Sequence, residues 1–213
     1  MSNLKNLLVY FLEHSPRLLG RTDLMKFVYS FEYYYYQLHK QHFTETTFIR
    51  YHYGPNDDSV VTATMELQQE GFVEIARIPT SKGNFFIQHE YTGKNTQQYS
   101  LPENAELVAC FILDRLGKEK YGGVIEFAYS TPPMKAVLDE EKRTGTNISG
   151  RVLDMDQKEK VFKSTRQEKE EARKRLKMRK FPECSQEEYY DHIVAQYQLY
   201  EDVRRRTSLV GDC

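Results

Sequence analysis

Residues 21–40, "RTDLMKFVYSFEYYYYQLHK", have the periodicity of an amphipathic helix and contain four consecutive tyrosines. Successive side chains of a helix point in different directions, so these four rings cannot all face one neighbour. Thr22 is a possible N-cap for a helix that extends to about Lys40. The predicted core face spans an arc of about 120° and consists of Leu24, Phe27, Val28, Phe31, Tyr34, Tyr35 and Leu38. A second stripe consists of Met25, Tyr29, Tyr33 and Tyr36.

This second stripe has two interpretations. The helix could be central and packed on both sides, which would bury the stripe inside the domain. Alternatively, the stripe could be an exposed surface for a protein partner, because tyrosine supplies a large contact area at low entropic cost.

Helices and strands are predicted on both sides of this segment. Apolar spacing predicts a helix over residues 4–12 that ends before Pro16, and capping residues begin another over 56–70. Residues 46–53 alternate as in a strand that stops at Gly54-Pro55, a pair that we expect to fix the turn. Tyr51 and Tyr53 would share one face of that strand. Residues 72–78 and 84–91 predict a β-hairpin.

The chain downstream is predicted to be helical. A helix over residues 102–118 would carry Leu107, Phe111 and Leu113–Leu116 on its apolar side. Residues 122–130 form a second helix that ends before Pro132-Pro133, and residues 134–141 begin a third. The fold class is therefore α+β and mostly helical, with a small winged-helix-like β-hairpin.

We expect a domain over residues 1–140 and a charged helical C-terminal extension over 141–213. Gly and Asn cluster at 140–150, which favours a joint there. The extension is predicted to form one helix over 156–180 and another after Pro182, where Ser185 and Glu188 form a capping box. Two interpretations remain open: a solvated helical hairpin docked on the domain, or an extension that specifies a partner.

Composition restricts the function classes. The formal net charge is −1, so no global basic field draws the chain to nucleic acid or to an anionic membrane. No long apolar run and no signal-peptide pattern is present, and the three cysteines form no metal-like pair, so we expect a cytoplasmic protein. Recognisable catalytic motifs are absent, and we predict neither an enzyme nor a cofactor or metal site.

A DNA-binding function is the alternative that the order of elements raises. Two helices, a short strand, a third helix and a hairpin match a winged helix-turn-helix in outline, with residues 56–70 as the recognition helix. That helix begins Asn56-Asp57-Asp58 and contains no Lys or Arg. An acidic helix is repelled by phosphates, so the chemistry argues against nucleic acid as a partner.

Residues 21–75 carry a family resemblance. A helix with an aromatic end, a strand with Tyr-x-Tyr-Gly-Pro and a helix that ends in Leu-x-x-Glu-Gly resemble the SocA/Panacea antitoxin domain, which occurs in bacteria and phages. "GVIEFAYSTPPMKAVLDEE" is similar to the closing segment of that family, so the resemblance covers about residues 4–140. A Ser-His-type signature of many relatives is missing before Pro132-Pro133, and the tail after about residue 150 has no counterpart.

The resemblance implies a protein that binds and neutralises a toxin, with a possible role as an adaptor for proteolysis. A phage-encoded host-takeover or counter-defence protein is a further alternative. From the residues we predict partner binding by Tyr29, Tyr33 and Tyr36 on the helix and by Tyr51 and Tyr53 at the strand end. Gly54 and Pro55 are predicted to form the turn.

Overall fold

The computed structural model describes residues 2–79, 83, 85–94 and 99–158, and beyond these only 167, 169–171, 173, 174, 194 and 195. The chain divides into two compact units, Met1–Lys160 and Val161–Cys213. The first unit confirms the α+β, mostly helical class, with a small antiparallel sheet and a separate two-stranded hairpin. None of the helices in the described residues combines the length and the apolar character that crossing a bilayer requires.

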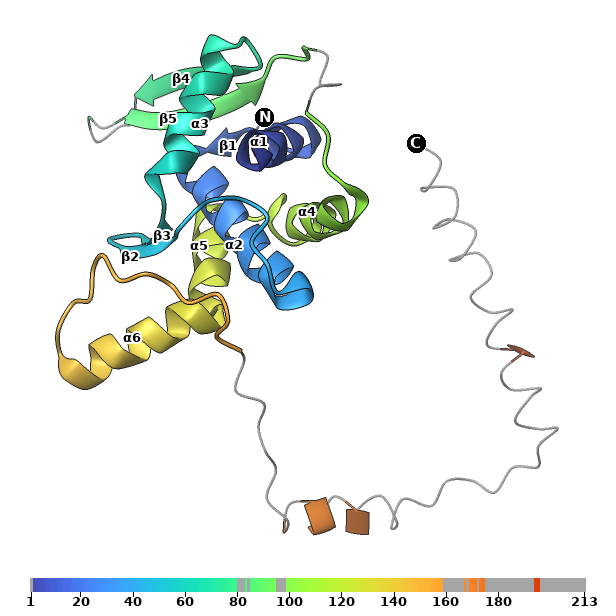
Figure 1. Ribbon diagram of the computed structural model, residues 1–213, viewed down its shortest axis with the longest axis vertical. Helices are drawn as coiled ribbons and strands as arrows, with labels where there is room; N and C mark the ends of the chain where they lie inside the picture. Colours follow the sequence, from blue (N-terminus) through green and yellow to red (C-terminus); the bar gives the residue numbers. More distant parts are fainter. Residues whose placement is uncertain are drawn as a thin grey trace. The chain divides into compact units, whose positions relative to one another are not determined.

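The elements of the first unit follow the predicted order with two added strands (Figure 1). In chain order they are α1 (Asn3–His14), β1 (Leu19–Gly20), α2 (Arg21–His39), β2 (Ile49–Tyr51), β3 (Gly54–Asn56), α3 (Asp58–Gln69), β4 (Val73–Pro79), β5 (Phe85–Tyr91), α4 (Glu103–Leu116), α5 (Tyr121–Ser130) and α6 (Pro132–Thr144).

Helix α2 lies at the centre of this unit and contacts α1, α3, α4 and α5 (Figure 1). Its N-cap is Gly20 rather than the predicted Thr22, and the Gly20 N–H donates to the Asp23 carboxylate at 2.9 Å. Both predicted stripes are largely buried, because different helices cover opposite sides of α2. The exception is Leu38, which was predicted in the core and is 69% exposed near the end of the helix.

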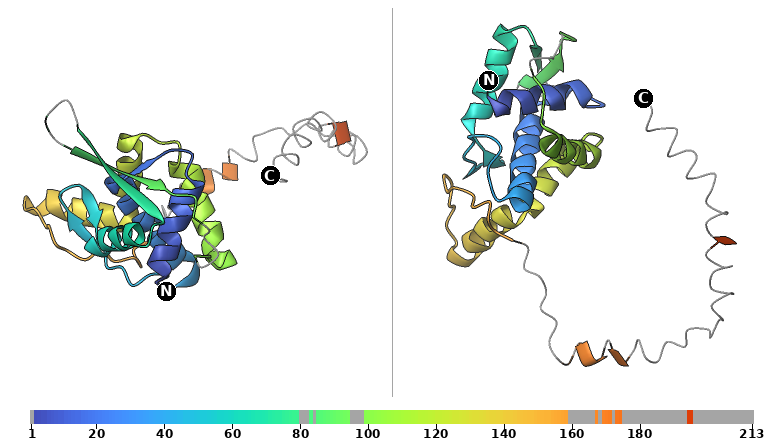
Figure 2. Two further views of the ribbon diagram at one scale, coloured as in Figure 1. Left: turned by 90° about the horizontal axis from the view of Figure 1, so that it is seen from above. Right: turned by 45° about the vertical axis from the view of Figure 1, so that its right-hand side comes forward.

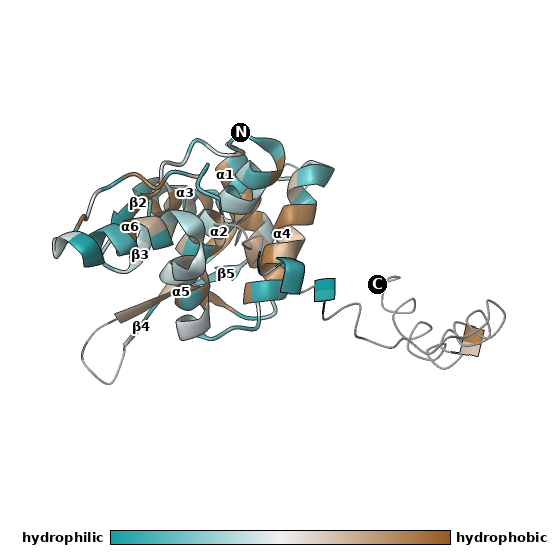
Figure 3. Cartoon of the chain, turned by 90° about the horizontal axis from the view of Figure 1, so that it is seen from below, coloured by the Kyte–Doolittle hydropathy of each residue, from teal (hydrophilic) through white to brown (hydrophobic). Residues whose placement is uncertain are grey.

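Strands β1, β5 and β4 form an antiparallel sheet in that order. With α1, α2 and α3 this sheet has the winged-helix-like arrangement, and the predicted hairpin is present as β4 and β5. The hairpin extends away from the helices (Figure 2), and hydrophobic residues lie near its closed end (Figure 3). Three of these residues have exposed side chains, namely Ile78, Phe85 and Phe86.

A buried carboxylate fixes the loop that follows α2. The Glu32 side chain is fully buried and accepts hydrogen bonds from the N–H of Thr44 at 2.8 Å and of Phe43 at 3.4 Å. Burial raises the pKa of Glu32, and the contacts from Thr44 and His42 oppose that rise. The loop is thereby held against α2, which sets where the chain enters β2.

Helix α4 buries a face that only partly matches the predicted one. Leu107 and Phe111 are 67% and 41% exposed, although the apolar pattern placed both on the core side. Leu116 is buried as predicted and Leu113 is partly buried, and the other buried residues of the helix are Ala105, Val108, Ala109 and Ile112. The two alanines are small, so α4 can pack closely against α1 and α2.

The chain returns to the domain after α6. Val152 pairs with Ile49 of β2, and the N–H of Leu153 donates to the Phe48 carbonyl at 2.8 Å. Leu153 and Met155 are buried, so the compact unit continues past the predicted boundary at residue 140. The two helices predicted for the C-terminal extension fall almost wholly outside the described residues.

Candidate functional site

The tyrosines predicted on α2 belong mainly to the core. Tyr29 is fully buried, its hydroxyl hydrogen-bonds the Thr131 hydroxyl at 2.6 Å, and burial raises its pKa. Tyr33 is 6% exposed, and the half-buried Tyr36 packs on His42 with a centroid separation of 4.9 Å. A partner could not reach Tyr29 or Tyr33 without opening the domain. The partner-binding prediction is corrected at these two positions.

Tyr51 and Tyr53 occupy a different environment. Residues 49–56 form the hairpin of β2 and β3 in place of the single predicted strand. Tyr51 ends β2 and Tyr53 lies in the turn, so the strand period does not relate their side chains. They are 45% and 71% exposed. Two large rings are therefore presented to solvent at the tip of one hairpin.

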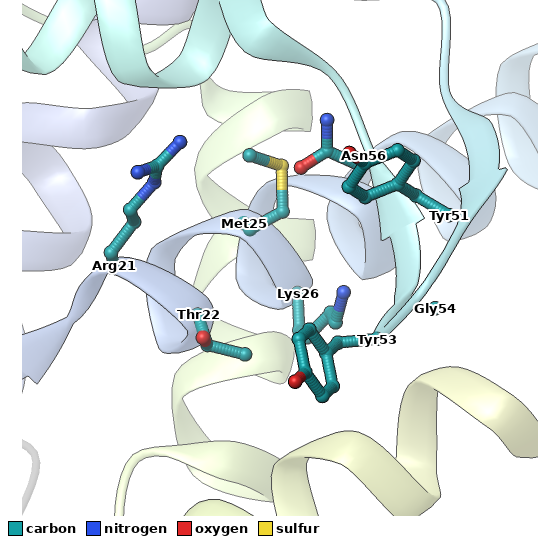
Figure 4. Close-up of a pocket in the computed structure, with 8 residues that line it drawn as sticks. All are labelled: Arg21, Thr22, Met25, Lys26, Tyr51, Tyr53, Gly54 and Asn56. Atoms are coloured by element: carbon teal, nitrogen blue, oxygen red, sulfur yellow. The ribbon is translucent and has the colours of Figure 1, made fainter. Parts of the chain in front are cut away.

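A pocket lies between this hairpin and the first turns of α2 (Figure 4). Its volume is about 260 Å³. The α2 side chains stand on one side and the two tyrosine rings on the other, as the close-up shows. The lining residues are Arg21, Thr22, Met25, Lys26, Tyr51, Tyr53, Gly54 and Asn56.

Lys26 is the buried cation of this pocket. The residue is 2% exposed, and its Nζ donates to the Pro55 carbonyl at 2.6 Å. Burial, with a smaller contribution from Arg50, lowers the pKa of Lys26 from 10.5 to about 7. Among the described residues, no carboxylate forms an ion pair with Lys26. The pocket therefore contains a cationic group whose charge its surroundings do not neutralise.

Lys26 was not among the predicted site residues, although the sequence carries a signal for it. The residue precedes Tyr29 by three positions and Tyr33 by seven, so all three share one face of the helix. A lysine inside an aromatic stripe is exceptional, because an ammonium group is costly to bury. Packing of the hairpin on α2 brings Asn56 together with Arg21 and Thr22 at the pocket. The periodicity of the sequence does not show this packing.

Gly54 and Pro55, the predicted turn residues, are buried at the start of β3. Gly54 has φ +91°, and a Cβ atom there would stand 2.6 Å from a ring carbon of Tyr129 on α5. Two features therefore require glycine at this position: the positive φ of the backbone and the close approach of the backbone to the Tyr129 ring. This contact holds the hairpin, and with it Tyr51 and Tyr53, against the helices.

Replacing Gly54 with alanine should lower the free energy of unfolding by about 2 kcal/mol, because positive φ and ring overlap both oppose a Cβ atom. The matched control is Gly150→Ala, where φ is +89° and no atom of the described residues, the two chain neighbours aside, lies within 4 Å of the added carbon. That variant should lose only about 1 kcal/mol. Urea denaturation measures both values, and equal losses would show that the Tyr129 contact contributes nothing.

The described residues contain no group of three or more His, Cys, Asp or Glu side chains arranged to hold a metal ion. The site consists of two exposed aromatic rings, polar groups and a buried lysine, which is a chemistry suited to binding. Searches against protein-family models, curated proteins and solved structures find no match for the chain.

Proposed function

We propose that this chain is an antitoxin-like protein-interaction protein that acts in the cytoplasm and binds its partner at the β2–β3 hairpin. The observation that carries the proposal is the exposure of Tyr51 and Tyr53 at the rim of the Lys26 pocket. Tyrosine is enriched among the residues that dominate binding energy, and such residues sit beside pockets that exclude water.

Two contacts with the helices support this role for the hairpin. Gly54 packs on Tyr129, and Arg50 of β2 bonds Glu141 of α6 at 3.3 Å. A hairpin held at these points presents its rings with little ordering cost on binding. Neutralisation would follow if the partner's active surface were covered by the hairpin and its polar rim.

The resemblance to the SocA/Panacea domain makes a toxin the partner that we propose, with delivery to a protease as a possible extension of the same binding. A DNA-binding regulator is the weaker alternative, because α3 offers no cation to phosphates.

Replacing Tyr51 and Tyr53 together with alanine should weaken partner binding about 100-fold or more, because hot-spot tyrosines each contribute strongly. The assay is co-expression with the neighbouring reading frame of the native genome. We expect the wild type to relieve growth arrest by a toxic neighbour and to co-purify with it, and the double variant to do neither.

Tyr121→Ala is the matched control, since Tyr121 is 50% exposed on α5 and does not line the pocket. It should retain binding and growth rescue. Circular dichroism must show that both variants are folded. Full rescue by a folded double variant would contradict the role of the hairpin, and tight sequence-selective duplex binding in a gel shift would favour the DNA alternative.

A further inference from the structure

The charges around the Lys26 pocket do not balance. Arg21 and Lys26 line the pocket, and Arg50 lies near enough to affect the pKa of Lys26. Among the described residues the one carboxylate paired with any of these three cations is Glu141, through Arg50 at 3.3 Å. Arg50 also donates to the Tyr51 carbonyl, while its buried Nε has no hydrogen-bond partner in the described part of the chain. Arg21 and a protonated Lys26 therefore give the pocket positive charge that no carboxylate of the described residues pairs with.

Lys26 also retains hydrogen-bonding capacity. An ammonium group has three N–H donors, and the described contacts use one, to the Pro55 carbonyl. Thr22 contributes a hydroxyl to the same pocket, and Arg21 stands at the end away from the hairpin (Figure 4). These groups are hydrogen-bond donors that favour an oxygen ligand with negative charge.

The walls of the pocket restrict the size and shape of that ligand. Met25 and the tyrosine rings give apolar surface next to the donors. A volume of about 260 Å³ is below the ~300–1,000 Å³ of pockets for drug-sized ligands. A short aliphatic stem that ends in a carboxylate fits both features, and its negative charge complements Lys26 and Arg21.

We propose that this pocket receives the carboxylate of an acidic side chain from the protein partner, with Lys26 as its counter-charge and Tyr51 and Tyr53 around its stem. The inference rests on the proposed function and names the chemistry of the partner's anchoring residue. The apolar surface of Met25 and the two rings favours a carboxylate on an aliphatic stem over a free phosphate.

The test is an NMR titration of the full chain at about pH 6 with two short blocked peptides, acetyl-Gly-Glu-Gly-amide and its Gln counterpart. The Glu peptide should produce saturable shifts at residues 21–26 and 51–56 and at the Lys26 side chain. The Gln peptide should bind about tenfold more weakly or more, because it lacks the charge. Equal shifts with both peptides, or no saturable shift with either, would overturn the proposal.

Sodium acetate and inorganic phosphate are two further ligands to be titrated. Acetate is expected to bind more weakly than the Glu peptide, because it lacks the stem that contacts Met25 and the rings. If phosphate binds more tightly than the Glu peptide, the site takes a free anion and the acidic side chain is the wrong ligand.

Lys26→Met should remove the difference between the two peptides while the variant stays folded. A second readout needs no variant: the pKa of Lys26 in the wild type, followed through its side-chain resonances, should rise when the Glu peptide is bound. The other charged or titratable groups near it are Arg21, Arg50 with Glu141, and the hydroxyls of Tyr51 and Tyr53. An unchanged pKa under saturating Glu peptide would contradict direct contact with Lys26.

These measurements use the chain alone, so they separate the two proposals. One outcome is that the Glu peptide binds selectively while no partner is found whose binding depends on Tyr51 and Tyr53. That outcome would refute the proposed function and support the carboxylate pocket. Partner binding through the tyrosines without peptide selectivity would refute the pocket and leave the function standing.

Discussion

Raising the pH from about 6 to about 9 should stabilise the folded chain by about 3 kcal/mol through Lys26 alone. Burial lowers the pKa of this lysine from 10.5 in the unfolded chain to about 7 in the folded one. Below the lower value both states hold the proton, and the destabilisation is complete. Between the two values only the unfolded state holds it, so the free energy of unfolding rises with pH.

Lys26→Met is the variant that isolates this effect. It should lose the rise between about pH 6 and pH 9, and at the lower pH it should be more stable than the wild type. The lost hydrogen bond to Pro55 costs about 1 kcal/mol, which is less than the cost of a buried ammonium group. Urea denaturation at several pH values gives both curves. Parallel curves for the two proteins would show that Lys26 keeps its ordinary pKa.

Replacing Glu32 with alanine should lower the free energy of unfolding by about 3–4 kcal/mol. The substitution leaves the buried N–H groups of Phe43 and Thr44 without an acceptor and opens space beside α2. Because this loop leads into β2, the hairpin should also lose order, which hydrogen exchange at residues 49–56 can follow.

Glu32→Gln is the control for this substitution. The amide oxygen can still accept from Thr44, so only about 1 kcal/mol should be lost. If alanine and glutamine at this position gave equally stable proteins, the loop would not depend on the two N–H acceptors.

Much of the fold could be predicted from local patterns. The helices α1, α2, α3 and α5 and the hairpin of β4 and β5 lie close to the predicted ranges, because apolar period, caps and prolines act over a few residues. Helix α4 shows the limit: its sequence offers two apolar arcs, one with Leu107 and Phe111 and one with alanines. Close packing against α1 and α2 selects the smaller residues, which hydrophobicity alone does not favour.

Residues 49–56 form the hairpin of β2 and β3, but the sequence predicted one strand there, because tertiary packing again decides the structure. Its turn consists of His52 and Tyr53, which are not turn-forming residues, and the bend depends on Gly54 packing against Tyr129 far along the chain. The sequence therefore predicted Tyr51 and Tyr53 as site residues but did not predict the turn that places their rings at one hairpin tip. Lys26 joins them only through its hydrogen bond to the Pro55 carbonyl, a contact 29 residues apart in the chain.

The pairing of β2 with residues 151–153 has a consequence for the order of events during synthesis. The ribosome releases the chain from its N-terminus, so Ile49 is exported long before its neighbour Val152. The Tyr29 hydroxyl must likewise await Thr131, which lies 102 residues later. The second face of α2 and the pairing of the hairpin are thus completed only after residues 131 and 152 have been made, and until then a nascent chain presents them to the cell unfinished.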